Sequence, residues 1–387
     1  MNAEPTPTTT TTTTASPGAA PIPRPAHRRH VRVAADDPYT RGTERGGQLR
    51  DGIPAAIEAY DRLFALGGVS PAQVREDAER ALDAIDRFRP GARAEIEGIA
   101  HGAGVDVWRV AALNARTEIL ARSTVVPPGE CTTVVRIRDV DAGDNPSAAG
   151  VFGVQTWDWH VELTDGWHTL ESRGGARGFV GLTENGILAK IGVNSAGLAL
   201  HFNILGHVRD GIGGVPVHVL AAVVLGEAGG VDEAVDIVRS APLGSSGSFA
   251  LFGEAGGALL DLSPVGVFEA RAEHGYLLRT NHFLTAVPAA DEKSWLYQPD
   301  SGERREFVRA RLADAKPPET AADLVGLLVT GPGEPPVTCV PDPGLPLGRR
   351  WASLATVTLD PATRTANVLD GTPADAARGP WRTLTAR

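Results

Sequence analysis

The chain has 387 residues, of which 42% are hydrophobic and 22% charged, and its formal net charge at pH 7 is -10. This length allows a large core, and because no apolar run approaches the ~18 residues that span a bilayer, a soluble globular protein is expected. The net negative charge and the lack of a long basic stripe argue against nucleic acid as a partner.

The first 35 residues are predicted to form a disordered, low-complexity tail. Seven consecutive threonines, Thr8 to Thr14, lie among prolines. Such a segment buries too little apolar surface to offset the entropy lost on ordering. It also lacks the apolar stretch of a secretory signal, so a cytoplasmic location and no membrane partner are expected.

Residues 36–130 are predicted to form a helical amino-terminal segment. Ser70 before Pro71 is typical of a helix N-cap, and apolar residues then recur at spacings of three and four as far as Phe88. Further helices are expected at about 53–66, 92–102 and 106–121. The Pro127-Pro128-Gly129 run ends this segment, because proline disfavours helix in the residue before it.

From Cys131 to the C-terminus, residues 131–387, the sequence predicts a β-rich segment with interspersed helices. Short β-branched or alternating runs predict strands at about 131–138, 150–157, 178–184, 187–193, 197–205, 248–254, 257–263, 265–271, 275–281, 353–360 and 365–371. Helices are expected at about 217–226, 232–240, 303–314 and 319–329. Many consecutive, largely antiparallel strands with flanking helices indicate a layered sandwich, not a strictly alternating dinucleotide-binding sheet.

Several catalytic signatures are missing from the sequence. There is no GxxxxGK[ST] loop for a nucleotide, and the ten histidines include no HExxH pair for a metal. Ser195 lies in a glycine-flanked turn whose spacing does not fit a nucleophile elbow. No metal and no organic cofactor are therefore expected. Two cysteines are too few for a disulfide scaffold, and Cys131 taken alone is more typical of a small buried residue than of a nucleophile.

Four motifs in a fixed order give Cys131 more weight: CTT at 131–133, WDW at 157–159, GVNSAGL at 192–198 and TNHF at 280–283. Together with LNARTEIL at 113–120, they resemble the penicillin acyltransferase family of cysteine N-terminal-nucleophile hydrolases, peptidase family C45. The resemblance implies an α+β fold, a four-layer αββα sandwich. It also implies self-cleavage between Glu130 and Cys131 into a heterodimer of residues 1–130 and 131–387, although Glu130 stands where the family often has glycine.

The chemistry of an N-terminal cysteine agrees with this resemblance. A thiol needs a base, and a free α-amino group with a pKa of about 7.7–8.0 would be tethered to the same residue. The expected reaction forms an acyl-thioester on Cys131 from a small-molecule amide or thioester and passes the acyl group to water or an amine. A coenzyme A thioester is one donor that this chemistry accepts. Inside an uncut chain the nitrogen is an amide and takes up no proton, so the precursor is expected to be inactive.

The resemblance implies roles for three more residues. Asp158 is expected to orient the new ammonium, and Asn281 to donate to the oxyanion. Arg350 is expected in the same network, with Arg349 as the alternative register. A strand-end carboxylate for Asp158 and a backbone-capping amide for Asn281 remain open. The candidate pocket residues are Thr133, Trp157, Trp159, Asn194 and His282. Core packing is an equal alternative for the two tryptophans, and a structural role stays open for Asn194.

Two other functions remain open on the sequence. A binding protein that kept the fold would not need Cys131, Asp158 and Asn281 together. An uncut cysteine hydrolase with a histidine base such as His282 is distinguished by whether the bond between residues 130 and 131 is cut. Cys339 is followed by Val340, not by a basic residue, and is expected to have no catalytic role.

Overall fold

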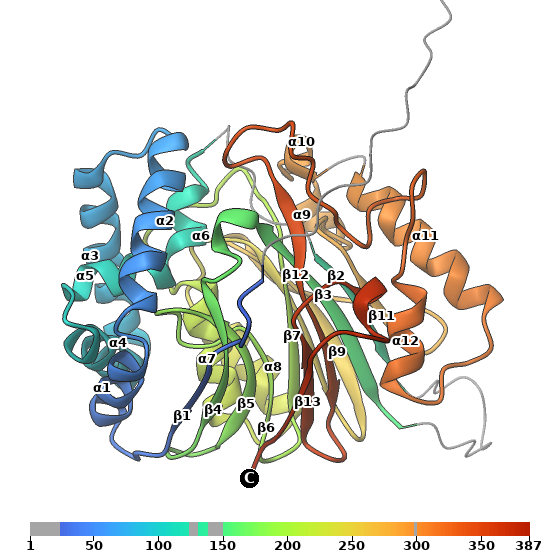
Figure 1. Ribbon diagram of the computed structural model, residues 1–387, viewed down its shortest axis with the longest axis horizontal. Coiled ribbons are helices and arrows are strands. Elements are labelled where there is room, and N and C mark those ends of the chain that lie inside the picture. The colour runs from blue at the N-terminus through green and yellow to red at the C-terminus, as the bar shows by residue number, and fades with distance from the viewer. Residues whose placement is uncertain (1–23, 124–130, 138–149, 298–299) are drawn as a thin grey trace, which may run out of the picture.

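The computed structural model describes residues 24–123, 131–137, 150–297 and 300–387. They form two stacked β-sheets between helical layers (Figure 1). Neighbouring strands are antiparallel, with one parallel pair at an edge. This architecture confirms the predicted αββα sandwich.

Sheet A has eight strands in the order β1 (His30–Val33), β4 (Trp167–Ser172), β5 (Phe179–Glu184), β6 (Ile191–Asn194), β7 (Ala199–Ile204), β8 (Gly247–Gly253), β9 (Gly256–Ser263) and β10 (Gly266–Ala270). Sheet B has six, in the order β11 (Tyr276–Arg279), β2 (Cys131–Arg136), β3 (Phe152–His160), β12 (Trp351–Asp360), β13 (Thr365–Leu369) and β14 (Trp381–Thr385). The inner faces of β2, β3, β12 and β13 contact sheet A. The larger hydrophobic core therefore lies between the sheets and under the amino-terminal helices.

Helices cover the outer face of each sheet (Figure 1). The amino-terminal ones are α1 (Pro38–Gln48), α2 (Gly52–Leu66), α3 (Pro71–Phe88), α4 (Pro90–Ala103), α5 (Val107–Asn114) and α6 (Arg116–Leu120). Two more, α7 (Val217–Glu227) and α8 (Val231–Ser240), pack on sheet A. Strand β11 is followed by α9 (Ala286–Ala289) and α10 (Ser294–Tyr297), and sheet B is covered by α11 (Asp300–Asp314) and α12 (Ala321–Leu327). Of the helices in the described residues, none is long and apolar enough to cross a membrane.

Helices α1 and α4 touch through their backbones because glycines line the contact. A Cβ atom added at Gly46 would lie 2.1 Å from the carbonyl oxygen of Ile99, and one at Gly98 would lie 2.1 Å from that of Tyr39. Neither glycine can be replaced without moving a helix. Three glycines within α1, at positions 42, 46 and 47, also weaken its helical pattern, and the sequence did not predict it as a separate helix.

The predicted 35-residue tail needs a correction. Residues 1–23 lie outside the described residues, but His30–Val33 forms β1 and pairs in parallel with β4. Val31 and Val33 enter the core, while Arg28 bonds to the carboxylate of Asp370 at 2.9 Å. The alternation of apolar and polar residues in HVRV is typical of a half-buried strand, and the low-complexity sequence before it concealed this short signal.

Candidate active site

Cys131 is the first residue of β2 and lies inside sheet B, between β11 and β3. Sheet A covers one face of β2 and α11 and α12 the other, which suits its β-branched sequence. Only 3% of the Cys131 surface is exposed, and the residue pairs with Trp157. The predicted cleavage residue Glu130 and the preceding Pro127-Pro128-Gly129 run lie outside the described residues.

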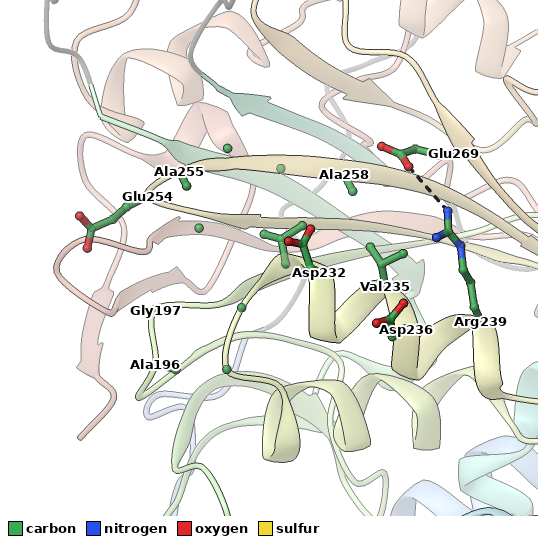
Figure 2. Close-up of a pocket in the computed structure, with 16 residues that line it drawn as sticks. Ala196, Gly197, Asp232, Val235, Asp236, Arg239, Glu254, Ala255, Ala258 and Glu269 are labelled. Carbon is green, nitrogen blue, oxygen red and sulfur yellow. Dashed lines mark ion pairs between the residues drawn. The ribbon is translucent and has the colours of Figure 1, made fainter.

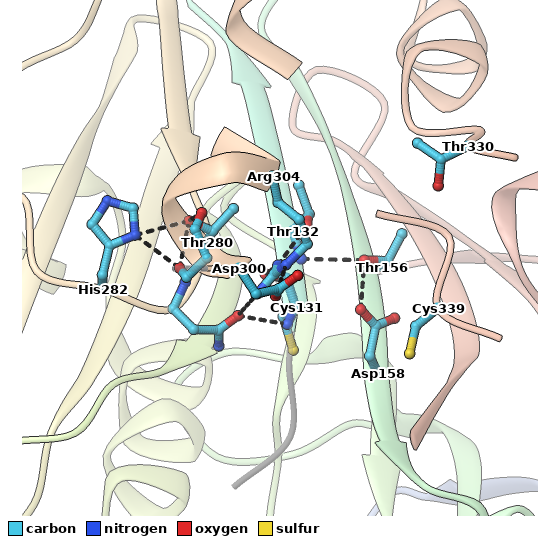
Figure 3. A network of polar contacts seen from close by, with 12 residues as sticks. Cys131, Thr132, Thr156, Asp158, Thr280, His282, Asp300, Arg304, Thr330 and Cys339 are labelled. Carbon is cyan, nitrogen blue, oxygen red and sulfur yellow. Dashed lines mark hydrogen bonds and ion pairs between the residues drawn. The ribbon is translucent and has the colours of Figure 1, made fainter. Parts of the chain in front are cut away.

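Three side chains bind the backbone polar groups of Cys131, as Figure 3 shows for Arg304. The Cys131 N–H donates to Asn281 Oδ1 at 2.9 Å. The Cys131 carbonyl accepts from Asn203 Nδ2 and from Arg304 Nη1, each at 3.1 Å. These side chains come from β7, from the end of β11 and from α11, so three separate elements fix the start of β2.

The orientation of Asn281 is set by its neighbours. Arg304 Nη2 donates to Asn281 Oδ1 at 3.1 Å, and since a guanidinium only donates, it keeps this oxygen towards Cys131. Asn281 Nδ2 donates to the carbonyl of Ile204 at 2.9 Å. The structure thus brings Asn281 to Cys131 as predicted, with its oxygen against the Cys131 nitrogen in the uncut chain. Donation to an oxyanion stays a prediction.

Amide side chains also connect the two sheets beside Cys131. Gln155 on β3 accepts from the N–H of Phe202 on β7 and donates to the carbonyl of the same residue. Thr133, a candidate pocket residue, donates through Oγ1 to Asn203 Oδ1 at 2.7 Å. Thr133 therefore orients Asn203, whose amide nitrogen in turn holds the Cys131 carbonyl.

Asp158 is fully buried on β3, one residue beyond Trp157. Its Oδ1 accepts from Ser353 Oγ at 2.6 Å and its Oδ2 from Thr156 Oγ1 at 3.4 Å. Thr156 Oγ1 in turn accepts from the N–H of Thr132 at 3.1 Å (Figure 3). Asp158 is thus linked through hydrogen bonds to the residue that follows Cys131.

In the uncut chain the thiol of Cys131 keeps its proton at neutral pH. Burial, followed by the negative charge of Asp158, raises the pKa of the Cys131 thiol to about 12. The positive charges of Lys190 and Arg304 and a hydrogen bond from the Asp158 backbone act in the opposite direction but do not offset this rise. Since the thiolate is the nucleophile, a thiol with this pKa needs a base close by.

Arg350 does not occupy its predicted place. Its Nη2 pairs with Glu162 Oε1 at 2.6 Å, and its side chain is 31% exposed. Trp351 pairs with His160, three residues beyond Trp157, so at about 3.3 Å per residue Arg350 lies roughly 13 Å along the strand from the level of Cys131. The alternative, Arg349, is exposed.

Arg304 is the arginine that contacts Cys131, and the sequence analysis missed it. It is fully buried on α11, with Nε bonded to Asp300 Oδ2 at 2.7 Å and Nη1 bonded to Thr132 Oγ1 at 3.1 Å. Its helix, DSGERREFVRARLAD, has the composition of a solvated charged helix. No local signal separates Arg304 from the other arginines of this helix.

Asn194 has the structural role that the sequence left open, because it holds a turn and does not line a pocket around Cys131. Its Nδ2 donates to the carbonyls of Leu225 and Ala228 at 3.1 and 2.8 Å, at the end of α7. Its Oδ1 accepts from the N–H groups of Ala196 and Leu198. The side chain therefore ties the β6–β7 turn to that helix.

His282 is also placed away from the thiol. Its Nδ1 hydrogen-bonds with Ser301 Oγ at 2.8 Å and with Thr280 Oγ1 at 3.3 Å. In Figure 3 it lies on the far side of Thr280 from Cys131. Burial, followed by nearby arginine charges, lowers the pKa of His282 to about 4. These contacts give no support to His282 as the base of an uncut enzyme.

Trp157 and Trp159 pack in the core, the alternative left open by the sequence. Each is 1% exposed. Trp157 stacks edge-on against Trp167 with 6.1 Å between ring centroids, and Trp159 Nε1 donates to the hydroxyl of Tyr60 at 2.9 Å. Their rings also cover cations, since Lys190 Nζ lies 4.6 Å from the centre of the Trp157 ring.

A buried ionic cluster, here the Glu184 cluster, lies under these tryptophans and consists of Glu184, Arg116, Lys190 and Tyr60. Glu184 Oε1 accepts from Arg116 Nη2 at 2.5 Å and from Lys190 Nζ at 2.9 Å, and Oε2 accepts from the Tyr60 hydroxyl. Burial favours the neutral acid, but the charges of Arg116 and Lys190 overcome it and lower the pKa of Glu184 to about 2. The sequence analysis did not identify this cluster.

A surface cavity of about 650 Å³ lies elsewhere, beside α8 and the β8–β9 turn (Figure 2). It carries Asp232, Asp236 and Glu254, and Arg239 pairs with Glu269 at 3.8 Å. None of its lining residues belongs to the contacts of Cys131. Within the described ranges, no three His, Cys, Asp or Glu side chains are grouped to hold a metal ion.

Comparisons with known proteins match part of this region. Residues 145–333, which include Asp158, Asn281 and Arg304 but not Cys131, match the family model acyl-coenzyme A:6-aminopenicillanic acid acyl-transferase. A curated relative, the 40 kDa form of acyl-coenzyme A:6-aminopenicillanic-acid-acyltransferase from Emericella nidulans, is 30% identical over 277 residues, which cover 69% of this chain and 72% of the relative.

Two solved structures are also similar. An N-acylethanolamine-hydrolyzing acid amidase ortholog from Caenorhabditis elegans gives a TM-score of 0.42 at 15% identity, over 60% of this chain and 93% of that one. Penicillin V acylase from Agrobacterium tumefaciens gives 0.44 at 14% identity, over 66% of this chain and 86% of that one.

Proposed function

The chain belongs to the acyl-coenzyme A:6-aminopenicillanic acid acyl-transferase family, and from this premise we propose that it is a self-cleaving cysteine enzyme with Cys131 as its N-terminal nucleophile. Cleavage between Glu130 and Cys131 yields a heterodimer of residues 1–130 and 131–387. The mature enzyme takes an acyl group from an amide or a thioester, coenzyme A thioesters included, onto Cys131 and passes it to water or an amine. The chemistry uses no metal and no cofactor.

The observation that carries the proposal is the hydrogen bond from the Cys131 N–H to Asn281 Oδ1. The acceptor is a side chain 150 residues away in sequence, and Arg304 holds it in place. The same oxygen can accept a hydrogen bond from a free α-amino group. It would then keep the base beside the thiol of the same residue, which a thiol with a raised pKa requires.

In this proposal maturation is a balanced displacement. Sγ attacks the carbonyl carbon of Glu130, the C–N bond to Cys131 breaks, and the nitrogen gains a proton to become an amine. Water then hydrolyses the thioester and releases the carboxylate of Glu130. Asn203 and Arg304 hold the carbonyl of Cys131 throughout, so the new terminus stays in place.

Turnover repeats the chemistry on an external substrate. The amine takes the thiol proton, Sγ attacks the substrate carbonyl, and donors placed for the oxyanion lower the barrier. The protonated amine returns its proton to the leaving group, and an acceptor then releases the acyl group from Sγ. Hydrolysis and acyl transfer share these steps and differ in which acceptor reaches the thioester.

Trapping the acyl-enzyme tests this function. Purified protein is mixed with acyl-coenzyme A thioesters and N-acyl amines, quenched in acid and measured by mass spectrometry. We expect an acyl adduct on Cys131 that is absent in Cys131→Ala and retained in the control Cys339→Ser. Turnover by Cys131→Ala, or an adduct on another residue during turnover, would contradict the proposal.

A further inference from the structure

Lys190 is an unusual buried cation in this chain. The sequence has three lysines among 37 basic residues, and Lys190 is 2% exposed. An ammonium has three donors, yet the one hydrogen bond of Nζ in the described part of the chain goes to Glu184 Oε1. Aromatic rings lie next to it, with centroids at 4.6 Å for Trp157 and 5.9 Å for Phe202.

Lys190 shares its one carboxylate partner with a second cation. In the Glu184 cluster the carboxylate of Glu184 serves both Arg116 and Lys190, and Arg116 is also attracted by the buried Glu118. A buried positive charge without its own counter-ion is costly, and the cost falls when a negative charge forms next to it.

Cys131 is the group beside Lys190 on which a negative charge would form. Cys131 and Trp157 face each other across β2 and β3, and side chains of directly opposed residues lie on the same face, with Cβ atoms about 5 Å apart. The ammonium over the Trp157 ring is therefore on the thiol side of the sheet. The charge of Lys190 also acts directly on Cys131, and that of Cys131 on Lys190.

We propose that Lys190 is the charge partner of the Cys131 thiolate, a role that rests on Cys131 being the nucleophile of the proposed function. When the thiol proton moves to the α-amine, the ammonium of Lys190 stabilises the charge left on Sγ. Glu184, which is itself bonded to Arg116, holds Lys190 in position.

Several charged groups surround this pair. Those that act on Lys190, on Cys131 or on both are Glu184 of β5, Arg116 of α6, His218 of α7, Asp158 of β3 and Arg304 of α11. Burial lowers the pKa of Lys190 to about 8, although Glu184 opposes this. Lys190 is therefore charged at neutral pH, and its support of the thiolate is lost as the pH rises above about 8.

The test is the rate of Cys131 alkylation by iodoacetamide at pH 7, where Lys190 carries its charge, quantified by peptide mapping so that Cys339 is counted separately. Lys190→Met is compared with the wild type, with Lys190→Arg and with the control Lys293→Met, which removes a lysine outside the cluster. We expect Lys190→Met to raise the pKa of the thiol by about one unit or more, so that alkylation at pH 7 slows about tenfold or more. Lys190→Arg and Lys293→Met should react at the wild-type rate.

An unchanged alkylation rate in Lys190→Met, or an equal slowing in Lys190→Arg, would overturn the proposal. Lys190→Met leaves Glu184 bonded to Arg116 and Tyr60, so no charge is left buried alone. Should it fail to fold, Lys190→Gln makes the same test with a neutral side chain that can still donate to Glu184, and an unchanged rate overturns the proposal. The measurement needs no cut chain, so an uncut wild type would contradict the proposed function while the alkylation rate still decides the role of Lys190.

Discussion

Arg304 shows at the scale of one residue how the start of β2 is held. Its guanidinium binds the carbonyl of Cys131, the hydroxyl of Thr132 and the amide oxygen of Asn281. Water does not reach these buried acceptors, and a buried polar group that loses its partner costs about 1–3 kcal/mol. Arg304 therefore supports both the nitrogen and the carbonyl sides of the nucleophile.

Arg304→Met is expected to slow maturation and to lower kcat by roughly 10²-fold, as the loss of these hydrogen bonds predicts. The matched control is Arg350→Met, which removes a partly exposed pair with Glu162 and should change either rate less than about threefold. The measurements are the rate at which fragments appear after synthesis and kcat on a confirmed substrate. A larger effect from Arg350→Met than from Arg304→Met would instead support Arg350 as the arginine of the catalytic network.

Asp158 determines the pH dependence expected of the mature enzyme. Its carboxylate raises the pKa of the Cys131 thiol, and it would raise that of a nearby α-ammonium in the same way. Asp158→Asn should lower both pKa values. Because the amine must be neutral to act as base, the acidic limb of the kcat/KM profile then moves to lower pH, while the plateau falls with the weaker base.

The comparison for Asp158→Asn is Ser353→Ala, which removes a hydrogen bond to the carboxylate but keeps its charge. The pH profile of Ser353→Ala should keep its acidic limb. An unmoved limb in Asp158→Asn would show that the carboxylate does not act on the base.

The sequence indicated Cys131, Asp158 and Asn281 because each lies in a short motif at or near a strand end. Arg304, Asn203 and Lys190 were not assigned roles, since they reach Cys131 through packing between elements that no local pattern reveals. Arg350 was chosen from its order before the last strands, and the register of β12 against β3 places it past the site.

At the scale of elements, the glycine contact between α1 and α4 gives a stability prediction. A Cβ at Gly46 would lie 2.1 Å from the backbone of Ile99, whereas one at Gly47 meets nothing within 4 Å. Gly46→Ala should destabilise the protein by about 1–3 kcal/mol. Gly47→Ala should be neutral or stabilise by up to about 1 kcal/mol, because alanine favours helix. Denaturant midpoints measure both, and equal midpoints would contradict the close contact.

Most elements were predictable from periodicity, but boundaries that matter for the site were not. The segment 187–193 was predicted as one strand, while β6 begins at Ile191 and Lys190 lies just before it. That small shift lets the Lys190 ammonium reach Glu184. The expected helix at 106–121 is two helices, α5 and α6, which end and begin on either side of Ala115.

At the scale of the whole molecule, contacts cross the proposed cleavage point in several places. Strand β1 belongs to sheet A, Arg45 Nη1 donates to the carbonyl of Leu188 at 2.8 Å, and Arg116 pairs with Glu184. Residues before and after position 130 thus share one core. The layer order followed from the sequence, whereas the parallel pairing of β1 with β4 depends on tertiary contacts.

The two fragments should therefore copurify under native conditions and separate only in denaturant. The pKa of Glu184 is lowered to about 2. The stability that its ion pairs contribute is therefore present in full above an ordinary glutamate pKa of about 4.3 and is lost as the pH falls through about 2. The fragments should accordingly stay together at pH 4.

Arg116→Met should lower the urea concentration at which the fragments separate, because it removes an ion pair across the cleavage point. The control Arg122→Met removes a pair with Asp77 that lies within the first fragment, so this concentration should stay near the wild-type value. Fragments that separate without denaturant, or equal effects of the two variants, would contradict a shared core.

The intact mass of freshly purified protein, measured under denaturing conditions, tests self-cleavage most directly. Wild-type protein should give two species, residues 1–130 and residues 131–387, with the second beginning at Cys131. Cys131→Ala should give one uncut chain without activity. A wild-type chain that remains whole while it turns over its substrate at full rate would contradict Cys131 as an N-terminal nucleophile.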